Sequence, residues 1–209
     1  MGALVAPSGA FIRGVHAVIS PSLLDELRSG TAAAHARVES RAGIERRLAR
    51  PGGYASLLAD LHALHAGFED LLAAVPGPDA MPPALLRPGR ARLLARDLEA
   101  LGHAPAAPQP PAVRIEGTAA ALGCLYVLEG SARGGAVIAA AARRRLGAGV
   151  PCDGLTGGGP AAARARWALL AATLEAFGAA VGPAERGEAV RAALGTFAAF
   201  EQRLCGAAP

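Results

Sequence analysis

The sequence contains no lysine, and all 21 of its basic residues are arginine. Aromatic residues make up only 4% of the 209 residues and the arginines are scattered, so a nucleic-acid-binding surface is not predicted despite the net charge of +4. The three cysteines, Cys124, Cys152 and Cys205, form no CxxC pair. This spacing argues against a zinc ribbon or a disulfide framework and favours a cytoplasmic location.

A long uninterrupted apolar run is also missing. The longest apolar stretch, residues 117–142, contains Glu129 and Arg133, and each charge costs roughly 2.5–3.5 kcal/mol at the centre of a bilayer. This stretch predicts a buried helix and no membrane span. Residues 1–21 lack the basic opening and apolar core of a secretory signal, so we expect a poorly ordered leader followed by one domain over residues 22–206.

The chain is rich in apolar residues, at 52%, and their spacing is helical nearly throughout. This content and the chain length suit one compact domain of about 200 residues. Stretches rich in proline and glycine separate the helical segments, and strand signals are nearly absent. The pattern predicts a single all-α domain with helices over residues 23–50, 54–75, 83–101, 115–146, 161–181 and 183–204.

The first predicted helix carries a histidine that could bind a metal. Arg28 precedes His35 by seven residues and Glu39 follows it by four, so all three share one helix face. A carboxylate commonly orients a metal-ligating histidine, and an arginine two turns away could bind an anionic group. A core histidine beside ordinary surface charge pairs would show the same pattern, so the residues alone leave both interpretations open.

Three glycines interrupt the fourth predicted helix. Gly130, Gly134 and Gly135 each cost roughly 0.8–1 kcal/mol relative to alanine in a helix interior. They indicate a kink, or a close approach of the backbone to something flat and bulky. A tight helix–helix crossing through Gly130 and Gly134 is the alternative.

Other candidate residues have simpler interpretations. His62 and His65 could share a face as metal ligands, but no Glu-x-x-His pair lies nearby, so packing or exposed histidines are expected. Cys124 lies in the apolar stretch and is expected to pack in the core. Arg143, Arg144 and Arg145 end a predicted helix, where positive charge is favourable, and could form part of a docking surface for an acidic partner.

Three segments resemble heme oxygenases, in particular the bacterial biliverdin-producing type associated with bacteriophytochromes. They are residues 27–39 (LRSGTAAAHARVE), residues 122–138 (LGCLYVLEGSARGGAVI, close to the family pattern LYVLEGSxLGGxxI), and the ending with Trp167 and residues 182–204. The resemblance implies a heme oxygenase-like helical bundle. It also implies that heme b is both substrate and cofactor, cleaved with O2 and electrons from an external donor to biliverdin, CO and Fe2+.

The resemblance assigns roles to residues around the heme. His35 would be the axial ligand of the heme iron, with Glu39 fixing its ring. Arg28 matches a basic residue that meets a heme propionate. Tyr126 is near the position of a pocket aromatic residue. The family's second propionate anchor has no basic counterpart, and Arg166 is the nearest substitute.

The same resemblance makes the glycine-rich helix the distal helix, whose backbone lies over the porphyrin. Ser131 stands where some relatives carry an acidic residue that organises water. Arg133 replaces a small or apolar residue of the pattern, so it would either pair with Glu129 or enter the distal pocket. The implied catalytic residues are Gly130, Ser131, Gly134 and Gly135.

A ferredoxin or flavoprotein reductase would supply the electrons, and a bacteriophytochrome could receive the biliverdin; neither nucleic acid nor membrane is an expected partner. Two other functions stay open. The first is a heme-binding sensor or carrier of the same fold without turnover, which Arg133 makes credible. The second is a basic helical interaction module that binds no heme.

Overall fold

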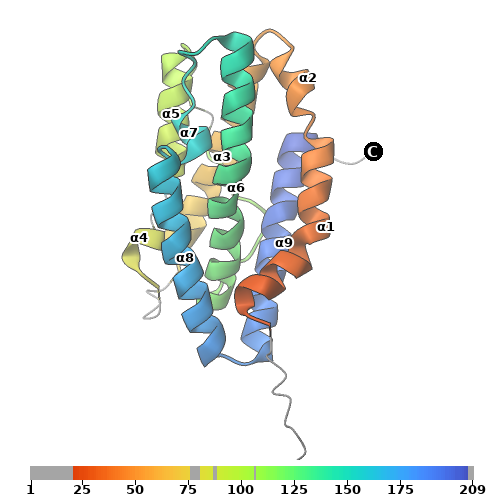
Figure 1. Cartoon of the computed structure of the whole chain (residues 1–209), viewed down its shortest axis with the longest axis vertical. Helices are drawn as coiled ribbons and strands as arrows, with labels where there is room; N and C mark the ends of the chain where they lie inside the picture. The colour runs from red at the N-terminus through yellow and green to blue at the C-terminus, as the bar shows by residue number, and fades with distance from the viewer. Residues whose placement is uncertain (1–20, 76–80, 87–88, 106, 207–209) are drawn as a thin grey trace, which may run out of the picture.

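The computed structural model describes residues 21–75, 81–86, 89–105 and 107–206, and this part of the chain forms helices and no strand (Figure 1). The prediction of a single all-α domain is therefore confirmed. The predicted leader lies outside the described residues apart from Pro21. The helices are α1 (Leu23–Arg41), α2 (Ile44–Leu48), α3 (Gly53–Ala73), α4 (Pro83–Leu86), α5 (Arg90–Ala100), α6 (Gly117–Leu146), α7 (Asp153–Thr156), α8 (Pro160–Ala180) and α9 (Pro183–Cys205).

Helix α1 begins at a capping serine and ends earlier than the sequence pattern predicts. The backbone N–H of Asp25 donates to Oγ of Ser22 at 3.2 Å, which satisfies a free donor at the helix start. The helix stops at Arg41 because Gly43 has a φ of 57°, a left-handed conformation that glycine adopts readily. The single helix predicted over residues 23–50 is therefore wrong, and α1 and α2 occupy its place.

Two other boundaries differ from the prediction. The helix predicted over residues 83–101 is divided into α4 and α5, and Gly89 precedes α5 with a φ of 66°. The loop predicted after residue 146 contains the short helix α7. In contrast, α6 continues as a helix from Gly117 to Leu146 through all three glycines. These glycines therefore do not interrupt the helix.

Helices α6 and α9 form the centre of the bundle. Helix α9 packs against both α6 and α1, whereas direct contact between α1 and α6 is sparse. Gly123 permits the close approach of α6 to α9, because a Cβ atom there would lie 2.0 Å from the carbonyl oxygen of Ala189. Helix α9 thus supports α1 and α6, the two helices that carry the predicted site residues other than Arg166.

The apolar stretch of α6 is part of the core. Leu122, Leu125 and Leu128 are fully buried, and none of the described helices has the length and apolar content needed to cross a bilayer. The three cysteines are free thiols, and Cys124 is buried. Burial raises the pKa of Cys124 to about 12, which fits the predicted packing role.

Candidate functional site

His35 lies on α1 with an accessible and oriented imidazole. Its side chain is 57% exposed, so the core-histidine interpretation is wrong. The Nδ1 atom lies 3.5 Å from Oε2 of Glu39, and the ring meets Phe197 of α9 edge to face, with centroids 5.7 Å apart. The Nε2 atom forms no hydrogen bond or ion pair with the described residues. A ring held on one side with one nitrogen open suits a metal ligand.

Arg28 extends this face of α1 by two turns. Its Nη1 atom lies 3.4 Å from Oδ1 of Asp25, and both side chains are more than half exposed. An ion pair this exposed contributes about 0–1 kcal/mol. The guanidinium therefore stays able to bind a carboxylate of a ligand, in line with the role that the resemblance implies.

The three predicted glycines of α6 have different surroundings. A Cβ atom on Gly134 would meet no heavy atom within 4 Å, whereas one on Gly135 would lie 1.9 Å from the carbonyl oxygen of Leu155. At Gly130 the nearest atom would be Cζ3 of Trp167, at 3.6 Å. Packing against α7 thus explains Gly135, and nothing in the described protein requires glycine at position 134. The proposed helix crossing through Gly130 and Gly134 is not observed.

The neighbouring polar residues of α6 are engaged locally. The hydroxyl of Ser131 donates to the carbonyl oxygen of Leu128 at 2.7 Å, within its own helix. Tyr126 is partly buried, and its ring centroid lies 5.9 Å from that of Trp167 on α8. Tyr126 therefore belongs to an aromatic contact between α6 and α8.

Arg133 and Arg166 lie differently from expectation. The guanidinium of Arg133 stacks 4.9 Å from the ring centroid of Trp167, so the first of its two predicted positions, an ion pair with Glu129, is not found. Arg166 makes that pair instead: its Nη2 and Nε atoms donate to the Glu129 carboxylate at 2.7 and 3.1 Å, and its Nη1 atom donates to the carbonyl oxygen of Ala84 at 2.9 Å. All three nitrogens of Arg166 are engaged, which argues against its role as a propionate anchor.

A buried arginine that the sequence did not single out connects α5 to α7 and to α6. Arg90 of α5 donates to the carbonyl oxygens of Gly154 at 2.7 Å and Leu155 at 2.6 Å, and more weakly to that of Leu128 at 3.4 Å. Burial lowers the pKa of Arg90 to about 10. No sequence signal distinguishes it from the other arginines, because its partners are backbone atoms. Phe197 was missed as a neighbour of His35 for a similar reason, since no motif links the two.

His62 and His65 lie inside α3 and are both buried. Burial lowers the pKa of His65 well below its usual value, with Arg90 and His62 adding to the effect. Among the described residues, no group of three or more His, Cys, Asp or Glu side chains could hold a metal ion. Their burial makes both histidines core residues, which is the packing alternative of the prediction.

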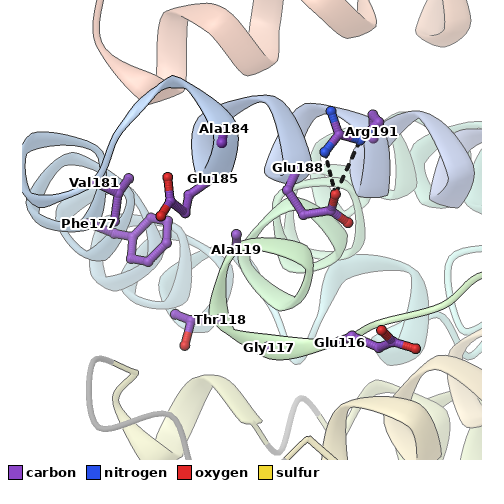
Figure 2. A pocket seen from close by; sticks show the side chains of 10 residues that line it. All are labelled: Glu116, Gly117, Thr118, Ala119, Phe177, Val181, Ala184, Glu185, Glu188 and Arg191. Atoms are coloured by element: carbon purple, nitrogen blue, oxygen red, sulfur yellow. Dashed lines mark hydrogen bonds and ion pairs between the residues drawn. The ribbon is translucent and has the colours of Figure 1, made fainter.

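A cavity of about 480 Å³ lies at the end of the bundle where α6 begins (Figure 2). Its side chains come from the start of α6, the end of α8 and the start of α9, and include Phe177, Glu116, Glu185 and Glu188. None of the predicted site residues lines this cavity. Arg191 also lines the cavity and pairs with Glu188 at 2.5 Å, and Arg114 pairs with Glu116 at 3.3 Å.

The residues on α1 and Gly134 of α6 fit an iron porphyrin. They provide an open imidazole nitrogen, an exposed cation for an acidic group, and a helix backbone that no side chain covers. The structure joins His35 with Glu39 and Phe197. Within the described ranges, no hydrogen bond, ion pair or ring contact joins His35 to the α6 glycines.

Comparison with known proteins supports the same fold. No family model and no curated protein matches the chain. Among solved structures, the chain is similar to the NO- and CO-bound heme oxygenase from Neisseria meningitidis, with a TM-score of 0.72 over 88% of this chain and 91% of that chain. The two sequences are 21% identical, so the likeness concerns the fold. The chain has the fold of a bacterial heme oxygenase.

Proposed function

We propose that this protein is a heme oxygenase that cleaves heme to biliverdin, CO and Fe2+ with O2 and electrons from a ferredoxin or flavoprotein. The observation that carries the proposal is the imidazole of His35, which is exposed, oriented through Nδ1 and open at Nε2, on a bundle with the heme oxygenase fold. When bound, heme would supply both the iron that activates O2 and the porphyrin that is oxidised.

The residues of the chain would bind and orient this group. His35 would ligate the iron through Nε2, and Glu39 would hold the ring by accepting a hydrogen bond from the Nδ1–H group. A neutral imidazole does not push electron density as a thiolate does, so it suits oxidation of the porphyrin itself. Arg28 would neutralise a propionate, and the phenyl ring of Phe197 would limit rotation of His35.

On α6, the proposed role belongs to Gly134. Alanine would be preferred by about 1 kcal/mol at a helix interior position, and the described protein leaves room for it. Glycine there keeps the backbone open to a flat ligand and to O2. Gly135 and Ser131 contribute to helix packing and local hydrogen bonding instead.

A sensor or carrier without turnover is the second candidate, and its main support was an arginine entering the distal pocket. Arg133 stacks on Trp167. We expect this contact to hold the cation on α8 when heme is bound, which would favour turnover over storage.

The test is an absorption titration with hemin, followed by ascorbate in air. Wild type is expected to show a one-to-one Soret band that His35→Ala loses, that free imidazole partly restores, and that gives way to a biliverdin band. His103→Ala is the matched control, since His103 is also exposed and lies in the loop after α5. A stable Soret band without ring opening would favour the sensor or carrier. Equal hemin binding by wild type and His35→Ala would contradict the proposal.

A further inference from the structure

The cavity between α6, α8 and α9 leaves apolar surface exposed and one carboxylate unpaired (Figure 2). Phe177 and Val181, at the end of α8, are both partly exposed there. The carboxylate of Glu185 forms no hydrogen bond or ion pair with the residues that the structure describes. Glu188 pairs with the exposed Arg191, and a pair of this kind contributes about 0–1 kcal/mol. The cavity therefore suits an occupant that is apolar on one side and positively charged on the other.

The segment that precedes α1 combines these two properties in its sequence. The first acidic residue of the chain is Asp25, whereas residues 11–20 (FIRGVHAVIS) contain Arg13 and, three residues later, His16. The large apolar residues of this segment recur at the spacing of one helix face: Phe11, Ile12, Val15, Val18 and Ile19. At the same spacing, Arg13 and His16 would share another face. The sequence thus separates apolar from basic side chains within one short segment.

The structure places the end of this segment close to the cavity. The Nη2 atom of Arg186 donates to the carbonyl oxygen of Pro21 at 2.5 Å, and its Nη1 atom donates to the carbonyl oxygen of Gly178 at 2.8 Å. Pro21 is therefore attached where α8 ends and α9 begins, and these two helix ends also line the cavity. The ten residues before Pro21 can span up to about 33 Å when extended, which is enough to pass around the start of α9.

We infer that residues 11–20 of the same chain dock in this cavity, with their apolar side chains against Phe177 and Val181 and with Arg13 paired to Glu185. Because the segment is attached at Pro21, its effective concentration at the cavity is in the millimolar range. A contact with a dissociation constant of about 1 mM, or roughly −4 kcal/mol, would therefore be substantially occupied. This docking would order part of the predicted leader, and it requires no heme, so it does not depend on the proposed function.

Other occupants fit the cavity less well. Ten residues line it, whereas a stable interface with a second protein or a second copy of this chain uses about 20–30 residues on each side. A free cationic ligand would lack the advantage of attachment to the chain. It would also find Glu116 and Glu188 already paired with arginines. A short attached segment that brings one arginine to Glu185 matches both the size and the charge of the cavity.

The test uses the absence of lysine from the chain. Arg13→Lys keeps the charge and introduces one side-chain amine, which a carbodiimide joins to a neighbouring carboxylate as an amide with loss of water. Mass spectrometry of the digested protein then identifies that carboxylate. A mixture of isotope-labelled and unlabelled protein distinguishes crosslinks within one chain from crosslinks between two chains. Arg92→Lys, at an exposed position of α5, is the matched control.

We expect Arg13→Lys to crosslink within one chain, and to do so at Glu185 at least about fivefold more often than at Glu175, an exposed carboxylate of α8 outside the cavity. The control Arg92→Lys should give no crosslink to Glu185. Crosslinks spread evenly over exposed carboxylates, or crosslinks that form only between two chains, would overturn the inference.

A second pair of variants tests the apolar part of the contact. Phe11→Ser/Ile12→Ser, added to Arg13→Lys, should lower the yield of the crosslink at least about threefold, because the segment then loses apolar surface that it would bury. Leu4→Ser/Val5→Ser lies outside the docking segment and should leave the yield unchanged. Equal yields in the two variants would overturn the inference. Failure of the wild type to bind hemin would contradict the proposed function alone, because the crosslink is measured without heme.

Discussion

The guanidinium carbon of Arg133 lies 4.9 Å from the ring centroid of Trp167, so this α6 arginine is engaged by α8. The sequence left two positions open for Arg133, an ion pair with Glu129 or a place in the distal pocket. The structure shows stacking on Trp167 in place of the ion pair. Because Arg166 occupies Glu129, the two arginines and their two partners join α6 to α8 side by side.

This stacking predicts a measurable coupling. Arg133→Gln, Trp167→Leu and the double variant form a cycle whose interaction free energy we expect to be about 0.5–1 kcal/mol, the usual value for an exposed cation–π contact. Urea unfolding of the four proteins measures it. Arg191→Gln combined with Trp167→Leu is the control pair and should show additivity. Additivity in the first cycle would mean that the stacking contributes nothing to stability.

Gly134 and Gly135 are neighbours with opposite expected responses to alanine. Gly134→Ala should stabilise the fold by up to about 1 kcal/mol, because alanine favours the helix and its Cβ atom meets nothing. Gly135→Ala should destabilise it by about 1–3 kcal/mol through the clash with the Leu155 carbonyl. Urea unfolding measures both, and hemin titration should show weakened binding for Gly134→Ala. Unchanged hemin binding and turnover in that variant would remove Gly134 from the proposed site.

Glu39→Gln tests the orienting carboxylate. We expect hemin affinity to fall by up to about tenfold, the lower limit for loss of a residue that orients a metal ligand, because the Glu39 side chain is 67% exposed. The iron–histidine stretching band should shift, which a purely structural role would not cause. Glu99→Gln, on the exposed surface of α5, is the control. An unshifted band would show that Glu39 does not act on His35.

Because His65 is buried, we expect the folded protein to lose stability in acid. Its pKa is lowered well below 6.5 in the folded protein, mainly by burial and further by Arg90 and His62. Below pH 6.5 the unfolded chain therefore takes up a proton that the folded chain does not, and the free energy of unfolding falls by up to about 1.4 kcal/mol per pH unit.

Urea unfolding between pH 5 and pH 7.5 should show this slope in wild type and a shallower one in His65→Leu. Burial raises the pKa of Glu69 and of Asp97, which acts in the opposite direction. Those groups remain in both proteins, so the difference between the two slopes isolates His65. Identical slopes would contradict the prediction.

The fold was largely predictable because the spacing of apolar residues within a segment indicates a helix without knowledge of how the helices pack. The six predicted segments all contain helices, and Ser22 caps the first as expected. The breaks were harder to predict: Gly43 and Gly89 adopt left-handed conformations, whereas Gly130 and Gly134 remain inside α6. Only tertiary packing decides which glycines end a helix and which do not.

The site was predictable within one helix and less so between helices. The spacing of His35 and Glu39 determines their contact, because residues four apart meet on a helix. The partners of Arg133 and Arg166 depend on how α8 lies beside α6, which no local pattern encodes. Arg90 binds backbone oxygens, so no complementary residue in the sequence could have indicated it.

The hydrogen bonds of Arg90 also bear on the kinetics of folding. They join segments 38 to 65 residues apart in the chain, and such contacts form only after long loops have closed. We therefore expect them to be absent from the folding transition state. Replacement of Arg90 by methionine should then speed unfolding and leave the folding rate nearly unchanged. Arg90 would determine how long the native state lasts rather than how fast it forms.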